Sequence, residues 1–132
     1  MLNRRSTSVL AVALLALLGA IPAWAHDIIT NNGVTVTVHV DPNDEPVATQ
    51  PATIVIESVK TRTGVFTWKT CKCTLAVSDS SGKVLRQGPA TQRTPIVFPE
   101  PSAYQLTFAG RVRRNGVWRT FKIVDALRAD AP

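Results

Sequence analysis

The sequence has few of the residues that most often bind metals or react. Among 132 residues there are one methionine, two cysteines and two histidines. The methionine is Met1, which lies in a predicted export signal, so the processed chain has no thioether and a methionine-rich copper shuttle is excluded. Two cysteines are also too few for the disulfide framework that holds many small secreted folds together.

Catalytic motifs are missing as well. The sequence contains no Ser-His-Asp order, no nucleotide-binding glycine loop and no HExxH pair. Two histidines leave little room for general acid–base catalysis. We therefore expect that this protein is not an enzyme.

Acidic residues are scarce, with 9 Asp and Glu against 15 Lys and Arg. Arg4 and Arg5 belong to the predicted signal, and 15 less these two leaves 13 cations against 9 acids, a net charge of +4. The basic balance thus reflects a shortage of acids rather than a dense basic tract. Because no stacking motif accompanies the basic residues, nucleic acid is not expected as a partner.

Residues 1–25 have the pattern of a cleaved signal peptide. A basic start precedes an apolar stretch of about ten residues, well below the roughly 20 that span a bilayer. Ala23 and Ala25 then form the Ala-x-Ala pattern that signal peptidase recognises. We predict cleavage after Ala25, which leaves a periplasmic or secreted protein that does not span the membrane and begins at His26.

The remaining residues, 26–132, are expected to form a single domain. Short strands separated by turn signals are predicted throughout, without helical periodicity. The clearest strand is 33–40, whose valines alternate with Thr and His39. The prolines of 87–102 predict a loop with at most a brief strand at 96–98, and the segment after Asp125 predicts a frayed tail. Seven or eight short antiparallel strands predict an all-β, immunoglobulin-like β-sandwich, with a small open barrel as the alternative.

The dipeptide Asn115-Gly116 predicts a hairpin between 104–114 and 117–124, because both residues tolerate the positive φ of a type I′ turn. One face of this hairpin is apolar, and on the other face Arg113 lies opposite Trp118 for a cation–π contact. We expect a solvated edge that discourages aggregation, or else a docking surface for an acidic partner. The residues of this candidate partner surface are Arg111, Arg113, Trp118 and Arg119.

Cys71 and Cys73 lie in a segment, 71–79, that is predicted to be a strand and to follow a small strand at 65–68. Positions i and i+2 of a strand point to the same side, so both sulfurs could bind one soft ion, copper(I) or zinc. Their Cα atoms would lie about 6.5 Å apart, near the upper limit for a disulfide. A local disulfide and simple burial of two small side chains remain open as alternatives.

The two histidines form the second candidate group. His39 ends the predicted strand 33–40, and the carboxylate of Asp41 could share its ion or orient its imidazole. Cleavage after Ala25 would give His26 a free α-amine beside its imidazole, which together make a bidentate chelate. The alternatives are an exposed strand-end histidine and a disordered terminal residue. Because these are the only histidines, we expect both near one end of the sandwich.

A short exported sandwich that opens with His26 and has His39 and Asp41 at a strand end resembles the periplasmic copper-resistance CopC-like proteins. The strand count and the passage Phe98-Pro99-Glu100 before Tyr104 also resemble the small YtkA-like domains of bacterial envelopes. The CopC-like resemblance implies that copper(II) is held by the terminal histidine and an Asp-x-His pair. Here the order of that pair is reversed, so only His26 matches by position.

These observations lead to two hypotheses. In the first, an exported sandwich binds or delivers copper, or less suitably zinc, through Cys71, Cys73, His39 and His26. In the second, the protein is a non-metal envelope interaction module in which the two cysteines form a disulfide and the Arg-rich hairpin docks another envelope protein. The distance between the His39 ring and the two sulfurs separates the two hypotheses.

Overall fold

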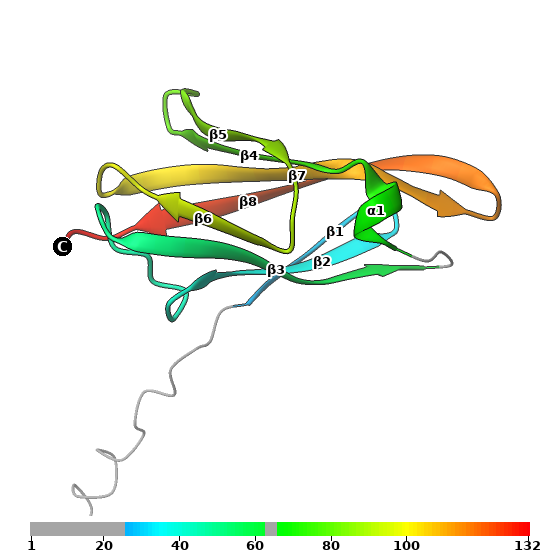
Figure 1. Cartoon of the computed structure of the whole chain (residues 1–132), viewed down its shortest axis with the longest axis horizontal. Helices are drawn as coiled ribbons and strands as arrows, with labels where there is room; N and C mark the ends of the chain where they lie inside the picture. Colours follow the sequence, from blue (N-terminus) through cyan, green and yellow to red (C-terminus); the bar gives the residue numbers. More distant parts are fainter. Residues whose placement is uncertain (1–25, 63–65) are drawn as a thin grey trace, which may run out of the picture.

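The computed structural model describes residues 26–62 and 66–132, which form two four-stranded antiparallel sheets and one short helix (Figure 1). The elements are β1 (Asp27–Asn31), β2 (Val34–Asp41), β3 (Pro51–Thr61), α1 (Trp68–Cys71), β4 (Thr74–Asp79), β5 (Val84–Pro89), β6 (Arg93–Val97), β7 (Ser102–Arg114) and β8 (Val117–Ala129). The prediction of an all-β sandwich with seven or eight strands is confirmed. Among the described residues no helix is long and apolar enough to cross a membrane.

The first sheet has the strand order β1-β2-β3-β6. Its inner face depends on the alternation of β2, in which every second residue is a buried valine. Asn32 and Gly33 connect β1 to β2 with φ values of 48° and 76°, as a type I′ turn requires. The valines that β2 buries are Val34, Val36, Val38 and Val40.

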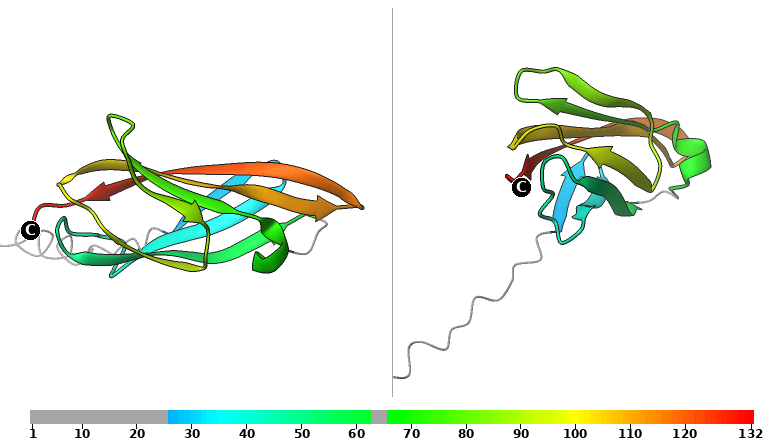
Figure 2. Two further views of the ribbon diagram at one scale, coloured as in Figure 1. Left: turned by 45° about the horizontal axis from the view of Figure 1, so that its top comes forward. Right: turned by 60° about the vertical axis from the view of Figure 1, so that its left-hand side comes forward.

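The second sheet has the order β5-β4-β7-β8 and contains the predicted hairpin. β7 and β8 pair from Arg114 and Val117 at the turn to Ser102 and Ala129 at the far end. The predicted apolar face points into the core, and all of its members are buried: Leu106, Phe108, Val112, Phe121 and Ile123. The core therefore lies between the two sheets, which Figure 2 displays as separate layers.

Tyr104 connects the start of β7 to the loop before it. Its hydroxyl donates a hydrogen bond to the backbone oxygen of Glu100 at 2.7 Å, and its ring packs on Phe98 with the centroids 4.8 Å apart. A tyrosine that bonds back to the backbone at this place is the tyrosine corner of immunoglobulin-like sandwiches. This contact agrees with the predicted immunoglobulin-like architecture.

The segment around the cysteines differs from the prediction. Residues 68–71 form the helix α1, and Thr67 caps it by accepting a hydrogen bond from the backbone N–H of Thr70 at 3.3 Å. Lys72 has a left-handed φ of 48°, and β4 begins only after it. The helix and the left-handed residue end the alternation on which the strand prediction depended. Val65, in the predicted strand 65–68, lies outside the described residues.

Two segments predicted as mostly irregular contain more strand than expected. The segment 87–102, predicted as a loop with at most a brief strand at 96–98, contains the end of β5 and the longer strand β6. Both are edge strands, where proline is tolerated because its missing N–H faces away from the sheet. The supposed tail after Asp125 continues β8. Beyond it, the Asp130 backbone donates to Pro46 O at 2.9 Å and accepts from Ala48 N at 2.8 Å. These bonds, and the complete burial of Ala129, hold the end of the chain in the sandwich.

Candidate metal-binding site

The register of β1 and β2 brings the two histidines together. Asp27 pairs with Val38, so the preceding residue, His26, lies opposite His39 in the same antiparallel register. Val38 points into the core, and its neighbour His39 therefore points to the outer face of the first sheet. The two imidazole rings meet edge to face, with their centroids 5.1 Å apart.

Glu57 reaches the same place through a β-bulge. Thr37 pairs with Ser58 and Val38 pairs with Ile56, which leaves Glu57 as an extra residue on β3. A bulge of this kind redirects side chains and interrupts the alternation of a strand. Glu57 Oε2 lies 3.5 Å from His26 Nδ1, so β2, β3 and the residue that precedes β1 each contribute one side chain to the group.

The three side chains are spaced closely enough to be considered as ligands of one ion. One donor atom from each of His26, His39 and Glu57 lies within 4.8 Å of the others. Because bonds from a transition metal to nitrogen or oxygen are about 2.0–2.2 Å, two donors of one ion lie at most about 4.3 Å apart. The distances between the donor atoms would have to shorten by about half an ångström. The side chains of His26 and Glu57 are exposed, so rotation about their bonds can bring the donors closer.

Two charged side chains, Asp41 and Arg93, hold the His39 ring in place. His39 Nε2 lies 3.3 Å from Asp41 Oδ1, and Arg93 Nη2 donates a hydrogen bond to Asp41 Oδ2 at 2.6 Å. The Arg93 guanidinium, with a smaller contribution from His39, holds the pKa of Asp41 below its usual value. In a neutral ring, a proton on Nε2 would face this carboxylate and leave the lone pair on Nδ1. Nδ1 is buried and has no hydrogen-bond partner in the part of the chain that the structure describes.

The cysteines do not join this group. Cys71 and Cys73 form a disulfide with their Cα atoms 5.0 Å apart, and both belong to the core between the sheets. They lie against Gly110 of β7, where an added Cβ would come within 2.5 Å of one sulfur and 2.8 Å of the other. The histidines stand on the outer face of the opposite sheet. The structure thus brings His26, His39 and Asp41 together without the sulfurs.

The candidate partner surface lies on the β7–β8 hairpin. In the register Arg113 is opposite Trp118, as predicted, but the guanidinium over the indole is that of Arg111, with its Cζ 4.7 Å from the ring centroid. Arg113 Nε instead donates to the backbone oxygen of Gly116 at 3.4 Å. The predicted cation–π contact therefore exists with a different arginine.

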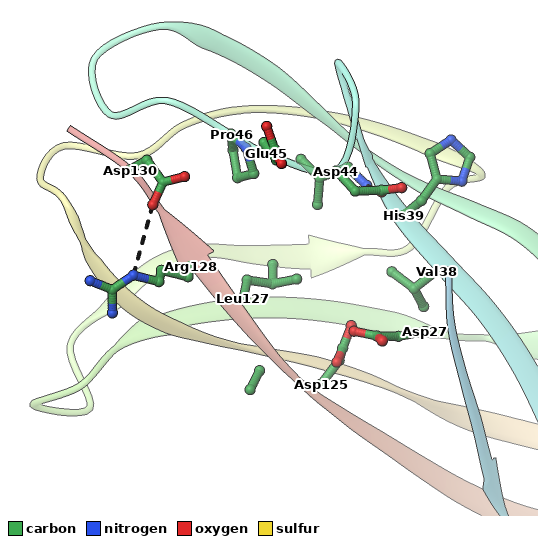
Figure 3. A pocket seen from close by; sticks show the side chains of 12 residues that line it. Asp27, Val38, His39, Asp44, Glu45, Pro46, Asp125, Leu127, Arg128 and Asp130 are labelled. Carbon is green, nitrogen blue, oxygen red and sulfur yellow. Dashed lines mark hydrogen bonds and ion pairs between the residues drawn. The ribbon is translucent and has the colours of Figure 1, made fainter. Parts of the chain in front are cut away.

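An acidic cavity of about 200 Å³ lies between β2 and β8 (Figure 3). In it the carboxyl groups of Asp27 and Asp125 face each other from β1 and β8. Burial, and then the charge of Asp27, raise the pKa of Asp125 to about 6. This pair connects the strand next to His26 with the second sheet.

Glu57 and Arg93 are the residues of the group that the sequence analysis missed. Neither follows a metal-ligand spacing, because each reaches the histidines only through strand pairing. Comparison with known protein families, curated proteins and solved structures found no match to this chain, so its function has to be argued from the geometry of the site.

Proposed function

We propose that this protein is an exported metal-binding protein and that copper(II) is the ion it binds or delivers. The observation that carries the proposal is the pairing of His26 with His39 across β1 and β2, with Glu57 beside them. Nitrogen and carboxylate oxygen donors suit copper(II), which also has the highest affinity among the common divalent ions for a site of this kind. Zinc is the second candidate, since it accepts the same donors.

The predicted cleavage after Ala25 supports this proposal, because it would complete the donor set. The new α-amine of His26 and its own Nδ1 would close a chelate ring on one ion. Nδ1 is also the atom that lies 3.5 Å from the Glu57 carboxylate. Processing would therefore add a strong nitrogen donor next to donors that the fold already groups.

The contacts of His39 also support a metal ligand. Histidines that bind metals usually donate their other N–H to a carboxylate, which fixes the tautomer and the ring orientation. Asp41 occupies that position at Nε2, and Arg93 in turn holds Asp41. His39 Nδ1 would then be the coordinating atom, and a bound ion would give this buried nitrogen a partner.

The proposed ligand set differs from the predicted one because it omits the thiolates. A disulfide sulfur is not the thiolate that binds copper(I) or zinc. Cys71 and Cys73 are therefore assigned a structural role, and the proposed ion changes from soft copper(I) to copper(II).

The test compares a protein that begins at His26 and has a free α-amine with the same protein acetylated at that amine. Copper(II) is titrated into each by calorimetry, and electron paramagnetic resonance records the nitrogen donors. We expect tight binding of one ion by the first protein and at least about tenfold weaker binding by the second, because an acetylated nitrogen has no lone pair to donate to the ion. Glu57→Gln should also weaken binding, whereas Glu100→Gln removes the same charge from an exposed residue of the loop before β7 and should not. Equal binding by the first two proteins would contradict the proposal.

The disulfide favours a second candidate function, a non-metal interaction module of the envelope. The bonded cysteines remove two of the four ligands first predicted, while the Arg-rich hairpin remains a surface for a partner. The same titration distinguishes the candidates, since an interaction module would take up no copper(II) even with a correctly formed terminus.

A further inference from the structure

Cationic side chains gather around the tip of the β7–β8 hairpin. The segments 30–37, 58–62 and 102–124 contain no Asp or Glu. They contain seven Lys and Arg residues, which we call the basic tip: Lys60, Arg62, Arg111, Arg113, Arg114, Arg119 and Lys122. These seven are more than half of the 13 cations that follow residue 25.

Contacts between the strands join these segments into one surface. Arg114 Nη1 donates a hydrogen bond to the backbone oxygen of Asn32 at 3.1 Å, and its guanidinium lies so close to Gly33 that any side chain there would collide with it. Arg114 also lines one open cavity of about 570 Å³ together with Lys60 and Arg62. Cations that are distant in sequence therefore meet at the same end of the sandwich.

The apex of the hairpin is apolar. Val117 and Trp118 follow the Asn115-Gly116 turn and are 52% and 43% exposed. The Arg111 guanidinium stacks on the indole and restricts its motion. In Figure 2 the hairpin projects beyond the rest of the sandwich, so this apex reaches outward ahead of the other elements.

The charge of the opposite end has the opposite sign. The acidic cavity described above is lined by five carboxylic acids: Asp27, Asp44, Glu45, Asp125 and Asp130. The Asn115-Gly116 turn lies at one end of the β7–β8 hairpin, and Ala129, the neighbour of Asp130, lies at the other end. The molecule is therefore polarised along its length, and an anionic surface would orient it with the basic tip forward.

We propose that the basic tip docks on an anionic lipid bilayer, with Trp118 and Val117 entering the headgroup layer. Arginine and lysine contact lipid phosphates, and tryptophan prefers the membrane–water interface because its ring is apolar at one end and polar at the other. A bilayer fits better than an acidic protein because the hairpin projects beyond the sandwich and the cations of the basic tip are spread over three segments. A flat, uniformly anionic surface contacts such a tip without a complementary cavity.

The experiment uses a protein that begins at His26 and carries Trp68→Phe, which leaves Trp118 as its only tryptophan. Vesicles of phosphatidylcholine are compared with vesicles in which about one third of the lipid is phosphatidylglycerol. We expect co-sedimentation and a blue shift of Trp118 emission with the anionic vesicles alone. Both should be lost in about 1 M salt, where the Debye length falls to about 3 Å.

Two variants locate the surface. Arg119→Gln removes an exposed cation of the basic tip and should weaken partitioning about fivefold. Arg86→Gln removes an exposed cation from β5, outside the basic tip, and should leave partitioning unchanged. No binding to the anionic vesicles would overturn the proposal and leave an acidic protein as the occupant. Equal losses in the two variants, or an unchanged Trp118 emission in the bound state, would also overturn it.

Discussion

The disulfide and the histidine group differ in where they lie and in how their residues come together. Cys71 and Cys73 are neighbours in sequence, bonded to each other and buried between the sheets. His26 and His39 are 13 positions apart (39 less 26), and strand pairing brings them together on an outer face. The two cysteines, which are close in sequence, form a structural link, whereas strand pairing groups the nitrogen and oxygen donors of residues that are distant in sequence.

The surroundings of the two pairs reinforce this contrast. The disulfide packs against Gly110, where the backbone of β7 leaves no room for even a methyl group. The neighbours of the histidines are polar and at least partly exposed: Glu57 contacts His26, Asp41 contacts His39, and Arg93 contacts Asp41. Changes at the first pair should therefore alter stability, and changes at the second should alter metal binding.

The largest effect is expected from His39→Gln. This substitution removes the buried nitrogen donor but keeps a side chain that can bond to Asp41, so the fold should be retained. We expect copper(II) affinity to fall by about 100-fold or more, measured by calorimetry with circular dichroism as the check on folding. An unchanged affinity for copper(II) would show that His39 is not a ligand.

Gly110→Ala tests whether packing against the disulfide determines stability and not metal binding. The new methyl group must displace the buried sulfurs or the backbone of β7, which should lower the free energy of unfolding by about 2 kcal/mol. Urea denaturation measures this loss. Gly88→Ala is the matched control, because a Cβ at that position meets no atom within 4 Å. Copper(II) affinity should be the same in both variants.

Asp41→Asn tests the residue that positions the His39 ring. The amide keeps the size of the side chain but removes the charge that faces Nε2 and Arg93. We expect about tenfold weaker copper(II) binding and an altered pH dependence of that binding, with stability nearly unchanged. A variant with normal affinity at every pH would show that the carboxylate has no influence on the ligand.

Asp125→Asn should have the smallest effect, on stability alone. Because the folded pKa of about 6 lies above the ordinary 3.8, the stability that the protonated carboxyl contributes is complete below about pH 3.8 and is lost as the pH rises through about 6. At pH 8 the free energy of unfolding of the variant should therefore be about 1 kcal/mol higher than that of the wild type. This difference is smaller than the full pKa shift would give, because the cavity is open to water. Near pH 4 the two proteins should be equally stable in thermal unfolding, and a gap of the same size at both pH values would rule out this linkage.

Much of the fold was predictable from local patterns. The valine alternation of β2 and the Asn115-Gly116 turn each specify their element through one physical rule, period-two burial or tolerance of positive φ. The same kind of turn occurs at Asn32-Gly33, where it joins β1 to β2. The left-handed Lys72 follows no such rule, and it invalidated the predicted strand at the cysteines.

The candidate site was predictable only in part. His26, His39 and Asp41 were identified because of their chemistry and the predicted cleavage. Glu57 was not, because it joins them only through a bulge that depends on the pairing of two strands. Arg93 was not predicted either, because it lies in β6, whose Pro95 favoured a loop at this place.

The most direct test of the account is a copper(II) titration of the protein that begins at His26 and carries both Cys71→Ala and Cys73→Ala. We predict the same stoichiometry, affinity and nitrogen-donor spectrum as in the unaltered protein, because the ligands stand on the outer face of the first sheet. Loss of copper(II) binding in this folded double variant, with binding retained in His39→Gln, would contradict the account.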